Sequence, residues 1–262
     1  MGTVHSADGT PISFDTWGDG QPLIMIDGAT SYRAVSQTNA QVGALLREEF
    51  RVYSYDRRGR GESGDTAPYA VQREIEDIDA MVGAAGGSAG LYGSSSGAAL
   101  ALEAAAAGIA ITKLALWEPP YIVGEGQPRP DPDTASIYRK FVSEGRRGDA
   151  VEYFMAKVVG MPAEFVGFAR SQPWWPAQEA LAHTLAYDAE IMGDYTIPTD
   201  RVARVAVPTL VLTGGASFDW MADTAKAIVD ALPDGRHQVL DGQSHDVSAD
   251  VLGPALAAFF AG

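Results

Sequence analysis

Residues 89–103 of the chain read AGLYGSSSGAALALE. They combine a short β-type run (89–92), the pentapeptide 93–97, and an alanine- and leucine-rich stretch typical of a buried helix (98–103). The pattern G-x-S-x-G between a strand and a helix is typical of a strained turn that lifts a serine above the carboxyl end of the strand. The segment therefore predicts a nucleophile at Ser95 within a strand-turn-helix unit.

Two other glycine-rich segments fit motifs without the required context. Residues 86–90 also match G-x-S-x-G, but Ser88 precedes the strand and is typical of a turn. Residues 59–64 match the dinucleotide pattern G-x-G-x-x-G, but three charged residues separate them from the preceding strand, and Pro68 blocks immediate entry into a helix. We expect a structured loop there and no nucleotide site.

Strand-like and helical patterns alternate on both sides of the Ser95 segment, which predicts an α/β fold with a mostly parallel sheet flanked by helices. The expected strands are 22–26, 51–55, 89–92, 113–117, 209–213 and 238–240. The expected helices of this part are 72–84, 222–231 and a last one ending at Phe260.

The middle of the chain has a different character. A proline-rich linker at 127–132 precedes helical patterns at 134–144, 149–159, 163–170 and 178–191, with no convincing strand among them. This arrangement predicts one α/β core domain, formed by residues 1–120 and 201–262, that carries an all-helical lid at residues 121–200.

Composition excludes several classes of function. The 262 residues include 34 acidic and 19 basic side chains, and the resulting net charge of −15 repels nucleic-acid phosphates and anionic lipid surfaces. The chain has no cysteine, which rules out disulfides, thiolate metal sites and a cysteine nucleophile, and its four histidines argue against a histidine-rich metal site. We expect a protein that needs no metal and no cofactor and acts on a small molecule.

Targeting signals are not evident. Residues 1–9 have neither the basic start nor the apolar run of a signal peptide, so a cytoplasmic location is expected. The longest nearly uncharged stretch, 97–111, is interrupted by Glu103 and is shorter than the ~20 residues of a membrane span. We therefore expect no membrane association, and the sequence does not indicate an oligomeric state.

Several motifs together resemble the alpha/beta hydrolase family. They are SADGT at 6–10, IDG at 26–28, YDRRGRGES at 55–63, the segment around Ser95, VPTLVL at 207–212 and GQSH at 242–245. The resemblance implies an α/β-hydrolase fold with a helical lid, and a triad in the chain order serine, acid, histidine. His245 then follows the last short strand, where this family places its catalytic base, and an imidazole cycles a proton near neutral pH. The other three histidines are expected to be surface or lid residues.

The resemblance also implies an oxyanion hole made by the backbone N–H groups of Ala29 and Ser96. Asp27 stands where most relatives of this type have histidine. Its carboxylate either disfavours anionic substrates or is a turn residue that bonds nearby backbone N–H groups. The three arginines of the 56–64 loop are expected to be scaffold or surface charges.

The acid of the triad departs from the common pattern, because Ser217 occupies the position where most relatives carry aspartate. Two carboxylates can take its place, Glu118 after strand 113–117 and Asp219 after strand 209–213. We favour Glu118, because some relatives place their acid at this earlier strand end and because its side chain is longer. The simpler alternatives are a cap on the lid linker for Glu118 and an exposed loop charge for Asp219.

The expected function is a serine hydrolase with an acyl-serine intermediate. Trp174, Trp175 and Tyr121 supply large apolar surfaces, which favours an apolar, uncharged ester or related carbonyl substrate; packing of lid against core is an equal alternative for these side chains. Two other functions stay open: a cofactor-free haloperoxidase or perhydrolase, and a non-catalytic ligand-binding protein on the same fold.

Overall fold

The structure is a computed structural model that describes residues 1–124 and 127–262. Within these residues one eight-stranded sheet has the order β1-β2-β4-β3-β5-β6-β7-β8. The strands are β1 Gly2–His5, β2 Pro11–Trp17, β3 Gln21–Ile26, β4 Phe50–Tyr55, β5 Ala89–Ser94, β6 Ile111–Trp117, β7 Thr209–Gly214 and β8 Gly235–Leu240. The strand pairs β1–β2 and β2–β4 are antiparallel, and every other pair is parallel. The predicted fold class is therefore confirmed.

The central strands are apolar along most of their length because helices cover both faces of the sheet. Residues 23–26 of β3 and 114–117 of β6 are fully buried. The hairpin of β1 and β2 turns at Ser6, whose N–H donates to the Thr10 carbonyl at 2.9 Å, and Gly9 supplies a φ of +84° in that turn. The motif SADGT at 6–10 thus forms the turn of an N-terminal hairpin.

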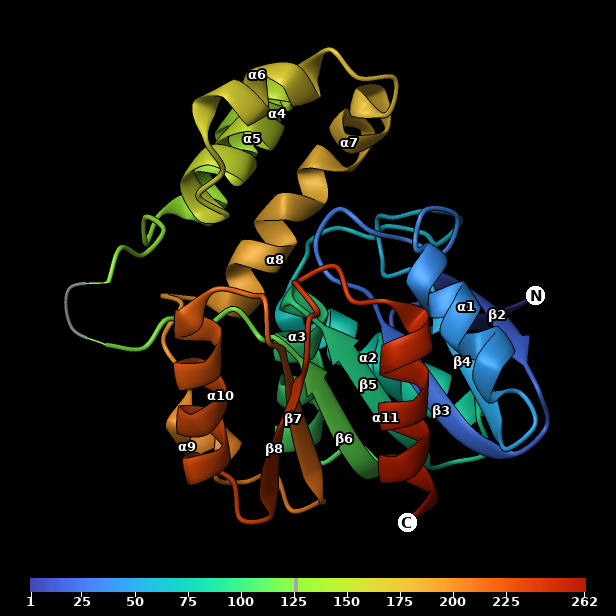
Figure 1. Cartoon of the computed structure of the whole chain (residues 1–262). Helices are drawn as coiled ribbons and strands as arrows, with labels where there is room; N and C mark the ends of the chain where they lie inside the picture. Colours follow the sequence, from blue (N-terminus) through green and yellow to red (C-terminus); the bar gives the residue numbers. More distant parts are fainter. Residues whose placement is uncertain (125–126) are drawn as a thin grey trace.

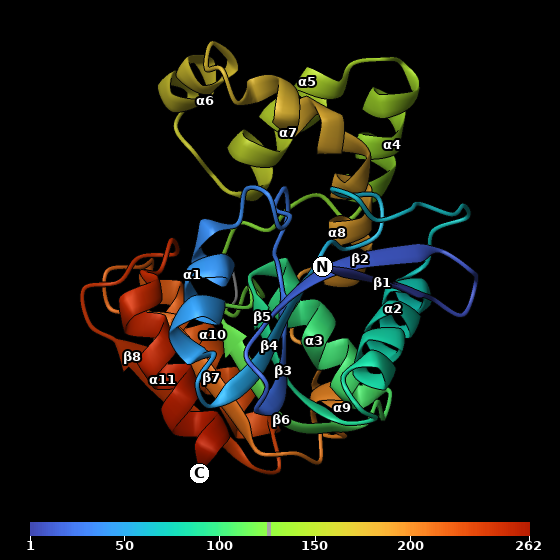
Figure 2. The ribbon, with the colours of Figure 1, turned by 90° about the vertical axis from the view of Figure 1, so that its right-hand side faces the viewer.

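Two helical layers flank the sheet, as Figures 1 and 2 show. α2 (Val71–Ala84), α3 (Ser96–Ala106) and α10 (Asp219–Ala231) contribute to one apolar cluster. α1 (Gln37–Leu46) and α11 (Ala249–Ala261) pack together in a second cluster with β3 and β7. The short α9 (Thr199–Val202) joins the first cluster through Val202.

A helical insert, residues 134–192, rises above the sheet in Figure 1. It contains α4 Thr134–Ser143, α5 Arg147–Tyr153, a π-helical turn Phe154–Val158, α6 Ala163–Arg170, α7 Trp175–Leu181, a 3₁₀ turn Ala182–Thr184 and α8 Leu185–Met192. The sequence predicts single helices at 149–159 and 178–191, and the structure interrupts each with one of these turns. The insert has its own apolar cluster, and α8 also contacts α3 of the core. The predicted lid range includes residues 125–126, which lie outside the described residues.

Candidate active site

Ser95 lies in the sharp turn between β5 and α3, with φ of +55° and ψ of −125°. A serine held in this region of φ/ψ space stores strain of order 1–3 kcal/mol, which surrounding contacts must compensate. The flanking glycines are required, because a Cβ at Gly93 would lie 2.3 Å from the Gly97 carbonyl oxygen, and one at Gly97 would lie 2.5 Å from that of Asp27. The Ser95 N–H donates to the Trp117 carbonyl at 2.8 Å, which ties the turn to the end of β6.

His245 pairs with Glu118 at the same edge of the sheet. The Nδ1 atom of His245 lies 2.6 Å from Oε2 of Glu118, and Oε1 of Glu118 accepts the Gly214 N–H at 2.8 Å. The Trp117 indole also donates to the His245 carbonyl at 2.9 Å. The ends of β6 and β7 and the loop after β8 are thus joined around one carboxylate.

The Glu118 side chain is fully buried, whereas the His245 side chain is 42% exposed. Burial alone would raise the pKa of the Glu118 carboxyl, but hydrogen bonds with His245 and the Gly214 amide, together with the nearby Ser217 hydroxyl, lower that pKa below its ordinary value. The carboxyl is therefore ionised at neutral pH and accepts both hydrogen bonds. Glu118 itself has a φ of +43°, which marks a second strained position beside Ser95.

Asp219 lies elsewhere. It is the first residue of α10 and is exposed to solvent, in agreement with the simpler of its two interpretations. Ser217, at the position where relatives carry aspartate, has a buried hydroxyl without a hydrogen-bond partner among the described residues. The structure therefore brings Glu118, and not Asp219, to His245.

The loop after β3 lies against the turn that holds Ser95. A Cβ at Gly28 would be 3.7 Å from Oγ of Ser95, so the peptide that leads to Ala29 is next to the serine hydroxyl. Ser96 begins α3, and its N–H is in the first turn of that helix, where backbone N–H groups have no intrahelical partner. Both predicted donor residues thus flank Ser95. The hydrogen bonds of the described residues do not include one from Ser95 to His245, a contact that is often long before substrate binds.

Asp27 is buried directly before this loop. Its Oδ1 accepts hydrogen bonds from the Ser36 hydroxyl at 2.7 Å and the Asn39 amide at 2.8 Å, while its Oδ2 has no partner among the described residues. Among the described residues, the donors to Asp27 are side chains of α1 and the preceding turn, and none is a backbone N–H group. The expectation that Asp27 bonds nearby backbone N–H groups is therefore wrong. Burial raises the pKa of Asp27 to about 6, because the hydrogen bond from Ser36 and the positive charges of Arg60 and Arg57 compensate only partly.

We expect Asp27→Asn to become more stable relative to the wild type as the pH rises. A carboxyl with a folded pKa near 6 and an unfolded pKa near 3.8 imposes no penalty below pH 3.8, and its full penalty is reached above pH 6. The shift corresponds to about 3 kcal/mol. Urea unfolding of both proteins between pH 4 and pH 8 measures it, with the exposed Asp219→Asn as the control. A stability difference that does not change with pH would contradict the expectation.

The three predicted pocket aromatics occupy different environments. Tyr121 is 1% exposed and belongs to the core cluster, where its carbonyl accepts the Thr224 hydroxyl. Trp175 is 4% exposed in the core of the helical insert, and its indole donates to Glu179 at 2.8 Å. Trp174 is 42% exposed. For Tyr121 and Trp175 these environments favour the packing alternative over a pocket wall.

Trp175→Ala should therefore destabilise the protein by about 3–5 kcal/mol without changing its order of preference among the esters that the sequence analysis expects as substrates. Trp174→Ala, at a partly exposed position, should cost less than about 1 kcal/mol. Thermal unfolding and a panel of p-nitrophenyl esters of increasing acyl length measure the two effects. A changed acyl preference at an unchanged melting temperature would instead place Trp175 at the substrate.

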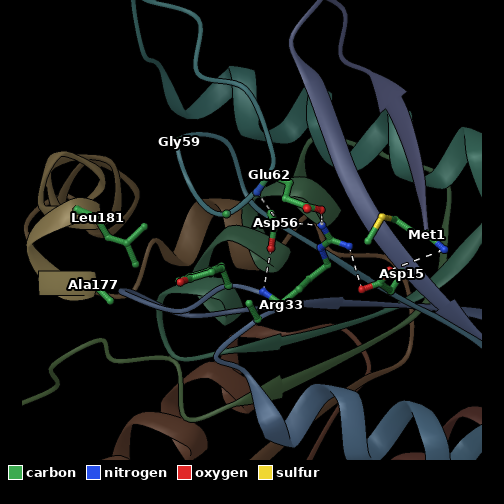
Figure 3. Close-up of a pocket in the computed structure, with 12 residues that line it drawn as sticks. Met1, Asp15, Arg33, Asp56, Gly59, Glu62, Ala177 and Leu181 are labelled. Carbon is green, nitrogen blue, oxygen red and sulfur yellow. Dashed lines mark hydrogen bonds and ion pairs between the residues drawn. The ribbon is translucent and has the colours of Figure 1, made fainter. Parts of the chain in front are cut away.

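A cavity of about 540 Å³ lies between the core and α7, and Figure 3 shows its walls. Arg33 lines this cavity and pairs with Asp15 at 2.9 Å, Asp56 at 3.0 Å and Glu62 at 2.6 Å. Neither Ser95 nor His245 lines this cavity. Its charged groups form ion pairs with one another, and Nε of Arg33 has no hydrogen-bond partner among the described residues.

The fold agrees with comparisons to known proteins. A family model described as "Alpha/beta hydrolase family" matches residues 20–252. The chain belongs to the alpha/beta hydrolase family. It is similar to an alpha/beta hydrolase from Sphaerobacter thermophilus, with 49% identity over 99% of this chain and 100% of that one and a TM-score of 0.91.

Two further proteins are similar to this chain, one named as a haloperoxidase and the other as an esterase. A non-heme haloperoxidase from Rhodococcus erythropolis is 25% identical over 99% of both chains. A thermophilic esterase from Thermogutta terrifontis is 21% identical over 99% of this chain and 97% of that one, with a TM-score of 0.73, a likeness that extends to the fold alone. Together with the family, the haloperoxidase relative supports an enzyme of the alpha/beta hydrolase class.

In residues 1–124 and 127–262, no helix is both long enough and apolar enough to cross a bilayer. The same residues contain no group of three or more His, Asp or Glu side chains arranged to hold a metal ion.

Proposed function

We propose that this alpha/beta hydrolase is a serine hydrolase that cleaves small, apolar, uncharged esters or related carbonyl compounds through an acyl-serine intermediate. The observation that carries the proposal is the 2.6 Å contact of His245 Nδ1 with the buried Glu118 carboxylate, on the sheet edge where β5 ends at the strained Ser95. This is the relation between base and orienting acid that a serine triad requires.

The proposed reaction begins with attack of Ser95 Oγ on the substrate carbonyl while Nε2 of His245 takes the hydroxyl proton. The Glu118 carboxylate holds the ring by its Nδ1 side and stabilises the imidazolium that forms. The N–H groups of Ala29 and Ser96 bind the oxyanion of the tetrahedral intermediate. Its collapse transfers the proton to the leaving alcohol and leaves an acyl-serine. Water then repeats the sequence, which releases the acid and restores Ser95.

The substrate class follows from charge. The net charge of −15 and the two buried carboxylates next to the site, Asp27 and Glu118, disfavour an anionic substrate. The helical insert, within the predicted range 121–200, acts as the lid over this edge of the sheet. The apolar side chains that would select the acyl group are not those of Tyr121 and Trp175, which are already packed.

The similarity to a non-heme haloperoxidase over 99% of both chains favours one second function. In a perhydrolase the same acyl-serine is attacked by hydrogen peroxide in place of water, and the products are a peracid and the free serine. This reaction needs no residue beyond those already named. It would use an acetate-type acyl donor, peroxide and, for halogenation, a halide that the peracid oxidises.

Labelling with a fluorophosphonate probe tests the proposal. We expect covalent labelling of the wild type at Ser95, identified by mass spectrometry, and turnover of p-nitrophenyl butyrate without added metal. Bromination of monochlorodimedone in acetate and peroxide would support the perhydrolase function in addition. Absence of labelling together with absence of ester turnover would favour a non-catalytic ligand-binding protein.

A further inference from the structure

Asp188, on α8 of the helical insert, has its carboxylate buried beside the nucleophile turn. Its Oδ1 accepts the Ser96 hydroxyl at 2.8 Å and Nη1 of Arg57 at 2.8 Å. Its Oδ2 accepts Nη2 of Arg60 at 2.7 Å. Asp188 is 5% exposed and both arginines are 1% exposed, so water does not screen these ion pairs. The insert therefore contributes a buried charged group next to the turn that holds Ser95.

The two arginines continue from Asp188 to the loop after β3. Nη1 of Arg60 donates to the Gly28 carbonyl and, at 3.4 Å, to that of Ser31. Nη1 of Arg57 donates to the Asp27 carbonyl at 3.3 Å. One carboxylate is thus connected to both segments that flank Ser95. On one side the connection is direct, through Ser96, and on the other it passes through a guanidinium.

The contact with Gly28 has a geometric consequence. The carbonyl of Gly28 and the N–H of Ala29 belong to one planar trans peptide unit and point in opposite directions. Holding the carbonyl oxygen toward Arg60 therefore fixes the direction of the Ala29 N–H. A charged donor on the carbonyl also polarises the peptide, which strengthens its N–H as a donor.

We propose that Asp188 is a positioning residue that aligns the two backbone donors of the oxyanion hole, Ser96 directly and Ala29 through Arg60. The inference rests on the proposed function. It makes catalysis depend on how α8 of the insert is docked, because Asp188 is supplied by that helix. Asp188 does not touch the reacting atoms.

The charge balance makes Asp188 more important to Arg60 than to Arg57. Arg57 also pairs with both oxygens of Glu74, at 2.7 and 2.8 Å. For Arg60, Asp188 is the one carboxylate partner among the described residues. Removing the charge of Asp188 leaves the Arg60 guanidinium buried without an ion-pair partner among the described residues. We then expect the guanidinium to move away from the Gly28 carbonyl.

The chain offers a matched control in Asp77. This residue is fully buried on α2 and accepts hydrogen bonds from Nε and Nη2 of Arg58, at 2.8 and 2.7 Å. Arg58 is buried like Arg60, but none of its described partners lies in the loop after β3. These partners are Asp77, Asp8, Ser6 and the Arg73 carbonyl. Asp77→Asn thus removes a comparable buried charge at a distance from the site.

The experiment compares Asp188→Asn, Ser96→Ala and Asp77→Asn with the wild type. It measures kcat and KM for p-nitrophenyl butyrate, the second-order rate of fluorophosphonate labelling, and the melting temperature. We expect kcat and the labelling rate of Asp188→Asn to fall together by at least ~10-fold with KM within ~3-fold, since loss of a full oxyanion donor costs ~10²–10³-fold. Asp77→Asn should lose comparable melting temperature but retain kcat within ~2-fold.

Ser96→Ala keeps the N–H and removes only the bond to Asp188, so it tests the same idea without an unpaired charge. It should lower kcat ~2–5-fold with a smaller loss of melting temperature than Asp188→Asn, because one buried hydrogen bond is lost while both ion pairs of Asp188 remain. A purely structural role of Asp188 would lower the melting temperature without lowering kcat. This variant also decides the matter if Asp188→Asn does not fold.

The two proposals fail in different ways. Wild-type protein that is labelled at Ser95 while Asp188→Asn and Ser96→Ala are labelled equally fast would overturn the positioning role alone. Equal losses of kcat in Asp188→Asn and Asp77→Asn, with Ser96→Ala unaffected, would do the same. Wild-type protein that is labelled no faster than Ser95→Ala would overturn the proposed function and the positioning role with it.

Discussion

Ser95→Ala is expected to abolish ester hydrolysis, with a fall in kcat of at least ~10⁴-fold. The hydroxyl oxygen is the atom that forms the acyl bond in the proposed reaction, and the hydroxyl of the next residue, Ser96, is bonded to Asp188. Stability should change by less than about 0.5 kcal/mol, because the turn geometry is held by Gly93, Gly97 and the Ser95 backbone, all of which the variant keeps. Kinetics with p-nitrophenyl butyrate and thermal unfolding measure both quantities.

Ser88→Ala is the matched control for this variant. Ser88 is exposed and precedes the first residue of β5, whereas Ser95 follows its last residue. A six-residue strand separates them by roughly 20 Å. Ser88→Ala should retain full activity, and an equal loss in the two variants would show that the assignment of the nucleophile is mistaken.

Glu118→Gln is expected to lower kcat at least ~10²-fold. The carboxylate accepts the Gly214 N–H on Oε1 and faces His245 Nδ1 with Oε2. A glutamine has one oxygen for these two positions, so its amide N–H₂ opposes either the Gly214 N–H or the Nδ1 proton of the ring. It also carries no charge to stabilise the imidazolium. Steady-state kinetics should therefore show a fall in kcat that exceeds any change in KM.

The control for Glu118→Gln is Asp219→Asn, which should leave kcat within ~2-fold because Asp219 is exposed at the start of α10. We also expect the free energy of unfolding to depend on pH differently in Glu118→Gln and in Asp219→Asn. A lowered pKa of Glu118 means that its contribution to wild-type stability is present above the unfolded pKa, near 4.5, and is lost as the pH falls through the folded pKa. The reverse pattern of activity, with loss in Asp219→Asn alone, would move the acid to the loop after β7.

The local sequence was sufficient for the elements that build the site. The apolar runs that became β3 to β7 are continuous because both faces of a parallel sheet are buried, so a short window of sequence carries the signal. The turn that holds Ser95 was equally local, since Gly93, Ser95 and Gly97 lie within five residues and their steric requirement is short-range. The family's motifs then led to the predictions for His245 and Ala29.

The tertiary structure alone decided which residues far apart in the chain pair with one another. Glu118 and Asp219 both follow parallel strands, and nothing local distinguishes them; the contact of Glu118 with His245 spans 127 residues. The arginines of the 56–64 loop could be scaffold or surface charges by sequence. Their burial depends on carboxylates of other elements, and Arg57 meets Asp188 across 131 residues. Strand and turn signals depend on neighbours within a few residues, whereas a buried ion pair depends on how whole elements dock. For that reason no local pattern indicated that Asp188 lies beside Ser96.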